Sequence, residues 1–157
     1  MSFDTEKVDV SAFFDGDYTT PSMELALFSQ AMIRHAFIMK ARVQQQRFIQ
    51  NLPIIEACLP HSPSWSESVF FTTLILIESI ALVDSVVTSS VEEELILVKE
   101  YACRFEQWSD DSPENYRHKY LMIVAGIASL EGDGSRAMEC YAQAIEEAKE
   151  AGFMQCE

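Results

Sequence analysis

Apolar residues recur at spacings of three and four along most of the chain, a pattern typical of amphipathic helices. It predicts a short helix over 54–59 and longer helices over about 23–50, 65–87, 90–108, 114–130 and 135–151. The segment 65–87 is apolar on nearly every face, so we expect other helices to surround it. No stretch of useful length alternates with a period of two. The pattern therefore predicts an all-α fold, with antiparallel helix pairs stacked in order as an α-solenoid.

Short polar connections separate these predicted helices. Ser64 or Ser66 is expected to cap the most apolar helix, because a side-chain oxygen there can accept from the first backbone amides. Gly132 is expected to make a tight turn between the last two helices. Gly152 is expected to follow the last helix in a left-handed conformation, which glycine adopts without strain.

The charge balance narrows the range of partners. The chain has 157 residues with 11 Lys and Arg against 25 Asp and Glu, a net charge of −14. A surface this acidic repels phosphates, so no nucleic acid and no membrane is expected as a partner. Glu78 and Asp84 interrupt the most apolar stretch, which predicts a buried helix rather than a membrane span. The first residues of the chain include several acids and no apolar stretch, so no signal peptide is predicted. We therefore expect a cytoplasmic protein. Residues 1–21 are an acidic N-terminal segment, and 22–157 are one helical domain.

No constellation of residues predicts catalysis. The four cysteines lack the close pairs that a zinc site needs, so we expect reduced thiols. There is no glycine-rich phosphate loop and no protein-kinase signature. The segment Asp15-Gly16-Asp17 lacks the further ligands of a calcium loop. We therefore predict no catalytic residue, no metal ligand and no cofactor.

Residues 118–151 carry a helix–turn–helix pattern. Small or apolar residues occupy regular positions of both helices: Leu121, Val124, Ala125, Ala128, Ala137, Tyr141 and Ala144. The segment resembles a tetratricopeptide repeat (TPR), whose second helix carries an alanine and an aromatic residue at this spacing. The resemblance implies that the alanines let the two helices approach closely. It also implies that Tyr141 packs against a following repeat.

A larger resemblance covers about a third of the chain, between Cys103 and Gln155. It is carried by Ser-Pro-Glu-Asn-Tyr-Arg-His-Lys-Tyr at 112–120, by Ala137-x₃-Tyr141-x₂-Ala144, and by Gly152-Phe153-x-Gln155. These stretches are similar to the TPR-like helical region of large hybrid sensor histidine kinases of cyanobacterial and fungal type. Such proteins combine a Ser/Thr-kinase-like domain, an AAA-type ATPase, GAF and histidine-kinase domains. The resemblance implies that this chain is a fragment of a longer protein, with an exposed solenoid end that self-associates.

Five residues are the candidates for binding a partner: Asn115, His118, Lys119, Arg34 and Arg42. The first three belong to the stretch that resembles the sensor kinases. The two arginines share one sector of the helix predicted over 23–50, within an otherwise acidic protein. The alternatives are an inter-helix hydrogen bond for His118, and pairing with the surrounding acidic surface for the arginines.

These observations predict a non-catalytic interaction or linker module within two-component (phosphorelay) signalling. Its expected partner is another protein, or a neighbouring domain of the same polypeptide. The alternative is a free-standing TPR-like adaptor unrelated to kinases.

Overall fold

Six α-helices and no β-strand make up the residues that the structure describes, which are 23–40, 51–60, 62–82 and 89–153. The structure is a computed structural model. Its helices are α2 (Met23–Ile38), α4 (Leu52–Cys58), α5 (Pro63–Ala81), α6 (Ser89–Asp111), α7 (Pro113–Leu130) and α8 (Gly134–Glu150). The predicted all-α class is confirmed. The acidic segment 1–21 lies outside the described residues.

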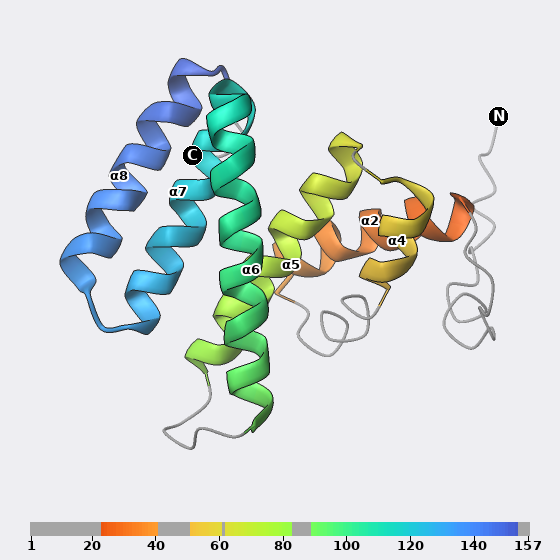
Figure 1. The fold of residues 1–157 in the computed structure, drawn as a ribbon, viewed down its shortest axis with the longest axis horizontal. Coiled ribbons are helices and arrows are strands. Elements are labelled where there is room, and N and C mark those ends of the chain that lie inside the picture. Colours follow the sequence, from red (N-terminus) through yellow and green to blue (C-terminus); the bar gives the residue numbers. More distant parts are fainter. Residues whose placement is uncertain (1–22, 41–50, 61, 83–88, 154–157) are drawn as a thin grey trace, which may run out of the picture.

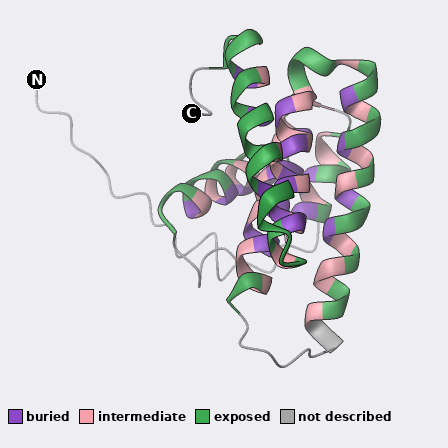
Figure 2. Cartoon of the chain, turned by 90° about the vertical axis from the view of Figure 1, so that its left-hand side faces the viewer, coloured by how far each residue is buried: buried purple, intermediate pink, exposed green. Residues whose placement is uncertain are grey.

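Helix α5 is the centre of the fold. It contacts α2, α4, α6 and α7, while α8 lies on the far side of α7 (Figure 1). Ten of its nineteen residues are buried, among them Val69, Ile75 and Leu76. This agrees with the expectation that the most apolar segment is surrounded by other helices. Figure 2 shows that buried residues gather where the helices face one another.

A cluster of aromatic rings joins α5, α6 and α7. Phe105 of α6 is fully buried, and its ring centroid lies 5.9 Å from that of Phe70 and 4.9 Å from that of Trp108. Trp108 in turn lies 5.3 Å from Trp65 and 5.5 Å from Tyr116. Two of these four pairs, Trp65–Trp108 and Phe105–Trp108, are edge-to-face, an arrangement that aromatic quadrupoles favour. The cluster fixes how α6 and α7 sit against the central helix.

The start of α5 differs from the sequence prediction. Ser62, and not Ser64 or Ser66, is its N-cap, because its Oγ accepts from the Trp65 amide at 3.1 Å. Pro63 occupies the first helical position, where a missing N–H costs nothing. Ser66 donates instead to the Pro63 carbonyl, at 2.9 Å.

Helix α2 ends earlier than the sequence predicts. The helix stops at Ile38, and Lys40 has a φ of 52°, a left-handed conformation that closes the last turn. The Lys40 ammonium pairs with Glu78 of α5 and lies 4.5 Å from the centre of the Phe37 ring. These contacts offset the strain of a left-handed lysine. The remainder of the predicted helix, residues 41–50, lies outside the described residues.

Helices α7 and α8 form a hairpin around Gly132, as the repeat pattern predicts. Gly132 has a φ of 80°, and the amides of Gly132 and Asp133 donate to Ser129 and Ala128, which caps the end of α7. Asp133 then caps α8 by accepting from the Arg136 amide at 3.1 Å. The predicted small contact residues of both helices are buried: Ala125, Ala128, Ala137 and Ala144.

Gly132 and Gly134 provide a matched test of this turn. Nothing lies within 4 Å of a Cβ added at either position, but only Gly132 has a positive φ. We expect Gly132→Ala to lower the free energy of unfolding by about 1–2 kcal/mol, the cost of a left-handed alanine. Gly134→Ala should leave it unchanged or raise it slightly, because alanine favours helix. Urea denaturation followed by circular dichroism measures both, and equal effects would contradict the role of the turn.

The expectation that Tyr141 of α8 packs against a following repeat is not met in the described residues. Tyr141 is 43% exposed and has no following repeat to pack against among the described residues. Met138 and Ile145, one turn before and one turn after it, are exposed as well. Together the three side chains form an apolar stripe beside the face that packs on α7.

The other end of α8 agrees with the sequence prediction. Gly152 has a φ of 80°, and the Phe153 amide donates to the Ala148 carbonyl at 2.8 Å. This closed turn places the Phe153 ring 4.8 Å from the ring of His118 on α7.

Candidate functional site

Two hollows lie along the outer side of α5, and Glu67 lines both of them. The first, of about 370 Å³, lies between α2 and α5, and the second, of about 360 Å³, lies between α5, α7 and Phe153. Hollows of this size are at the lower end of the range for ligand pockets. We name the two together the α5 groove.

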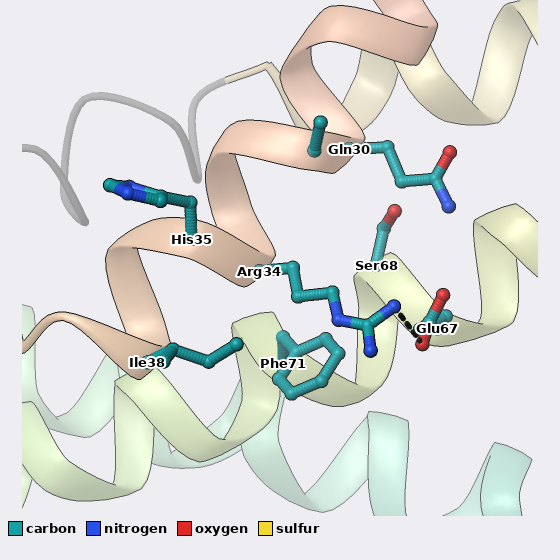
Figure 3. A pocket seen from close by; sticks show the side chains of 8 residues that line it. Gln30, Arg34, His35, Ile38, Glu67, Ser68 and Phe71 are labelled. Carbon is teal, nitrogen blue, oxygen red and sulfur yellow. Dashed lines mark ion pairs between the residues drawn. The ribbon is translucent and has the colours of Figure 1, made fainter.

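The hollow between α2 and α5 is mostly apolar, with a charged pair at its side. Ile38 and Phe71 supply apolar surface, and the Arg34 guanidinium extends toward the Glu67 carboxylate (Figure 3). Arg34 Nη1 and Glu67 Oε1 are 3.4 Å apart, and both side chains remain partly exposed. The guanidinium carbon also lies 5.9 Å from the centre of the Phe71 ring. His35 lines the same hollow but points away from Arg34.

The hollow beside α7 is more polar. Asn115, Tyr116 and Lys119 line it from α7, and Phe153 closes it from the segment after α8. The Lys119 ammonium lies 5.6 Å from the centre of the Tyr116 ring. The Tyr116 hydroxyl lies 3.4 Å from Ser66 Oγ, which ties α7 to the start of α5. This hollow therefore presents one cation, Lys119, one carboxylate, Glu67, and several uncharged polar groups.

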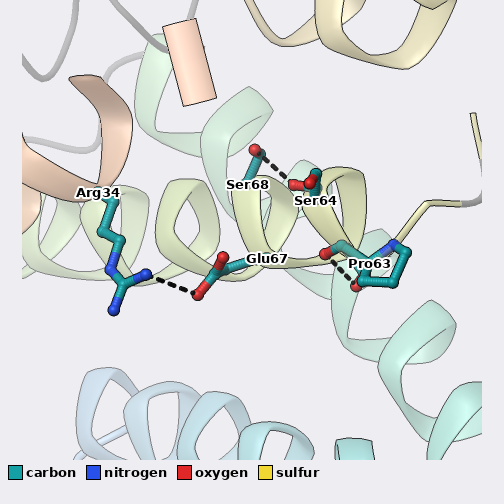
Figure 4. Close-up of polar contacts among 6 residues, drawn as sticks. Arg34, Pro63, Ser64, Glu67 and Ser68 are labelled. Atoms are coloured by element: carbon teal, nitrogen blue, oxygen red, sulfur yellow. Dashed lines mark hydrogen bonds and ion pairs between the residues drawn. The ribbon is translucent and has the colours of Figure 1, made fainter. Parts of the chain in front are cut away.

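Two of the three serines that line the groove, Ser66 and Ser68, donate their hydroxyls to the backbone of their own helix. Ser66 donates to the Pro63 carbonyl. Ser68 donates to the Ser64 carbonyl at 2.8 Å (Figure 4). A hydroxyl that donates to a helix carbonyl is held for structure, and no base accepts its proton.

Three of the five predicted partner-binding residues line the α5 groove. Arg34 lies on its α2 side, and Asn115 and Lys119 lie on its α7 side. Arg42 lies outside the described residues. The alternative for the basic residues of α2 was pairing with the surrounding acidic surface. Such pairs are present, since Arg34 pairs with Glu67 and Lys40 pairs with Glu78.

His118, predicted as a partner-binding residue, is buried and does not line the α5 groove. It is 1% exposed and lies with Leu121 and Ala125 on the buried face of α7. Neither ring nitrogen has a hydrogen-bond partner, so the expected inter-helix hydrogen bond is absent as well. Burial, with a smaller contribution from the Lys119 charge, lowers the pKa of His118 to about 4. The spacing 118, 121, 125 could have indicated this, because it places all three residues on one helical face.

Glu67 and Phe71 are two of the groove residues that the sequence analysis did not predict. They lie on the helix expected to be buried throughout, one turn apart, on the side left uncovered between α2 and α7. The signal in the sequence was the presence of the charged Glu67 within an otherwise apolar helix. This signal did not indicate that Glu67 would pair with Arg34.

The described residues contain neither a cluster that could hold a metal ion nor a helix that could span a membrane. In residues 23–40, 51–60, 62–82 and 89–153, no three acidic, histidine or cysteine side chains are placed to hold a metal ion. Cys58, Cys103 and Cys140 are free thiols. No helix of this part of the chain is both long and apolar enough to cross a membrane.

Comparison with known proteins gives no match to a protein-family model, a curated protein or a solved structure. The function proposed for this chain therefore rests on the groove and on the sequence patterns.

Proposed function

We propose that this chain is a non-catalytic protein-interaction module and that the α5 groove is its binding surface. The observation that carries the proposal is that Glu67 lines both hollows, which together involve three helices, α2, α5 and α7. Apolar side chains at Ile38, Phe71 and Phe153 offer hydrophobic contacts, and Arg34 and Lys119 flank them with charge. Interfaces combine apolar anchors with a polar rim in this way.

A TPR-like stacking of helix pairs is part of the proposal. The pairs would be α5 with α6 and α7 with α8, and the first helices of both pairs, α5 and α7, are in contact. Stacked pairs of this kind present their first helices on one concave face, where partner segments bind. The position of the α5 groove, between α2, α5 and α7, supports this arrangement.

Charge reversal tests the groove. The variant Arg34→Glu/Lys119→Glu changes both cationic sides, and Lys99→Glu/Arg136→Glu changes two exposed cations on α6 and α8 as a matched control. Each variant is expressed as bait in cells that naturally make this protein, and its complexes are cross-linked before capture. The captured proteins are quantified by mass spectrometry. We expect the groove variant to lose the partners of the wild-type chain by about tenfold, as when one or two charged contacts are removed.

The control variant should retain those partners. Circular dichroism must show both variants folded. If the groove variant captures the same proteins in the same amounts as the control, the groove is not the binding surface.

The sequence resemblance over residues 103–155 supports placing this module within a hybrid sensor histidine kinase. There it would join the ATPase and the sensor–kinase parts, or recruit a partner to them. The alternative is a free-standing adaptor. Sequencing the native transcript beyond codon 157 separates them: a reading frame that continues into a histidine-kinase core supports the first, and an immediate stop codon supports the second.

A further inference from the structure

We propose that the outer face of helix α8 binds a basic amphipathic helix of a partner protein. This face combines an exposed apolar row with a hollow that is edged with carboxylates. None of its residues lines the α5 groove, so the inference goes beyond the proposed function and does not depend on it.

The apolar part is the row formed by Met138, Tyr141 and Ile145, which we name the α8 stripe. Met138 is 76% exposed, the largest fraction among the large hydrophobic residues that the structure describes. Spacings of three and four place the three side chains on one side of the helix. Figure 2 views the molecule from the side of α8, and most of this helix is exposed. A second amphipathic helix, laid along such a row, covers it with its own apolar face.

A hollow of about 320 Å³ lies along the same helix. It is lined by a small residue, an amide and three carboxylates: Ala142, Gln143, Glu146, Glu147 and Glu150. Ala142 comes four positions after Met138 and four before Glu146, so it lies between the α8 stripe and the carboxylates. A lysine or arginine whose stem crosses Ala142 can place its charge among the glutamates, because these stems lie well on apolar surface.

Most carboxylates of this helix have no cation of their own. Helix α8 carries four glutamates, and in the part of the chain that the structure describes Glu139, Glu147 and Glu150 pair with no cation. The exception is Glu146, whose Oε1 lies 3.4 Å from Lys149 Nζ in an exposed pair. Exposed pairs of this kind contribute little, so an incoming cation can share that carboxylate. The charge left unpaired makes a cationic helix the complement of this face.

A second copy of the chain fits this face less well. Each chain has a net charge of −14. A twofold axis that packs two α8 helices antiparallel along the stripe would place the glutamates of both on the same side of the contact. Like charges brought together in this way oppose association.

A synthetic peptide serves as the probe. It has about four helical turns, with leucines at spacings of three and four and lysines at the other positions. Fluorescence anisotropy of the labelled peptide, at physiological ionic strength, measures its binding to the full chain. We expect saturable binding with a dissociation constant in the micromolar range. A peptide of the same composition in shuffled order has no apolar face and should bind about tenfold more weakly. Equal binding of the two peptides would show general charge attraction and would overturn the proposal.

Charge reversal on α8 tests the carboxylates. Glu147→Lys/Glu150→Lys should weaken peptide binding by about tenfold, as when close charged contacts are lost. Lysines near the C-terminal end of a helix are favoured by its dipole, so this variant should fold. The matched control, Glu100→Lys/Asp110→Lys, reverses two exposed acids of α6 and has the same net charge. Equal weakening by both variants would overturn the proposal, because binding would then depend on net charge alone.

Removal of apolar surface tests the stripe. Met138→Ser/Ile145→Ser should also weaken binding by about tenfold or more, since two apolar anchors are lost. Both residues are exposed, so the fold should be retained. Ile96→Ser, at an exposed position of α6, is the control and should bind as the wild type does. Wild-type affinity in the stripe variant would overturn the proposal.

Two further measurements separate the other occupants and the other surface. Sedimentation velocity should show a monomer at the concentrations used for the titration, whereas a dimer that Met138→Ser/Ile145→Ser dissociates would assign the face to a second copy and overturn the proposal. The groove variant Arg34→Glu/Lys119→Glu should bind the peptide no more weakly than the wild type. Loss of binding in that variant would place the peptide in the α5 groove, which also overturns the proposal.

Discussion

Replacement of Phe105 by alanine is expected to lower the free energy of unfolding by about 3–5 kcal/mol, the cost of removing a buried aromatic side chain. Phe105 is fully buried and contacts the rings of Phe70, Trp108 and Tyr116, which come from three helices. Alanine would leave a cavity at the junction of α5, α6 and α7. Since domains are stable by about 5–15 kcal/mol, this is a large fraction of the total.

Urea denaturation followed by circular dichroism and by tryptophan fluorescence measures the effect. Trp65 and Trp108 lie in the same cluster, so the fluorescence reports the junction directly. Ile96→Ala is the matched control, because Ile96 is also on α6 but is 60% exposed. It should change the free energy of unfolding by less than about 0.5 kcal/mol. A loss below about 1 kcal/mol for Phe105→Ala would show that the cluster is not central to the fold.

The pH dependence of stability is expected to carry a clear contribution from His118. In the folded chain the pKa of His118 is lowered from 6.5 to about 4, mainly by burial. Between these two values the unfolded chain binds the proton and the folded chain does not, so acid favours unfolding. The stability that depends on neutral His118 is complete above pH 6.5 and is lost as the pH falls toward 4. A shift of this size corresponds to about 3 kcal/mol, at roughly 1.4 kcal/mol for each pH unit.

The variant His118→Leu isolates this contribution from the carboxylates that titrate in the same range. Leucine removes two buried nitrogens that have no hydrogen-bond partner, so at pH 7 we expect stability equal to or above that of the wild type. The difference between variant and wild type should widen by about 3 kcal/mol from pH 7 to pH 4. His35→Leu, on the exposed side of α2, should keep the His118 contribution. Parallel curves for wild type and His118→Leu would contradict it.

The helical class could be predicted because each helix carries its signal locally. Spacings of three and four, together with Gly132 and Gly152, indicated the α7–α8 hairpin and both of its glycine-terminated ends. The structure bears these out because short-range hydrogen bonds decide them. The error at Ser62 is of the same local kind: Pro63 at the first helical position was a signal for the earlier start that was not used.

The α5 groove could not be predicted in the same way. Arg34 and Glu67 are 33 positions apart in the sequence, and no periodicity relates them. Their contact depends on how α2 crosses α5, which side-chain packing between distant segments determines. The contact between His118 and Phe153 shows the same limit, since Phe153 reaches the imidazole through the turn at Gly152.

Helix α8 is attached by small side chains, and this has a consequence for motion within the folded state. Its buried residues are Ala137, Ala144 and Ala148, and each methyl group removes little apolar area from water. Such a helix can detach transiently at a lower free energy than global unfolding requires. Detachment would leave the aromatic cluster of α5, α6 and α7 intact but would lift Phe153 from His118. We expect such local opening of α8 to expose the buried imidazole of His118 to solvent protons while the rest of the molecule stays folded.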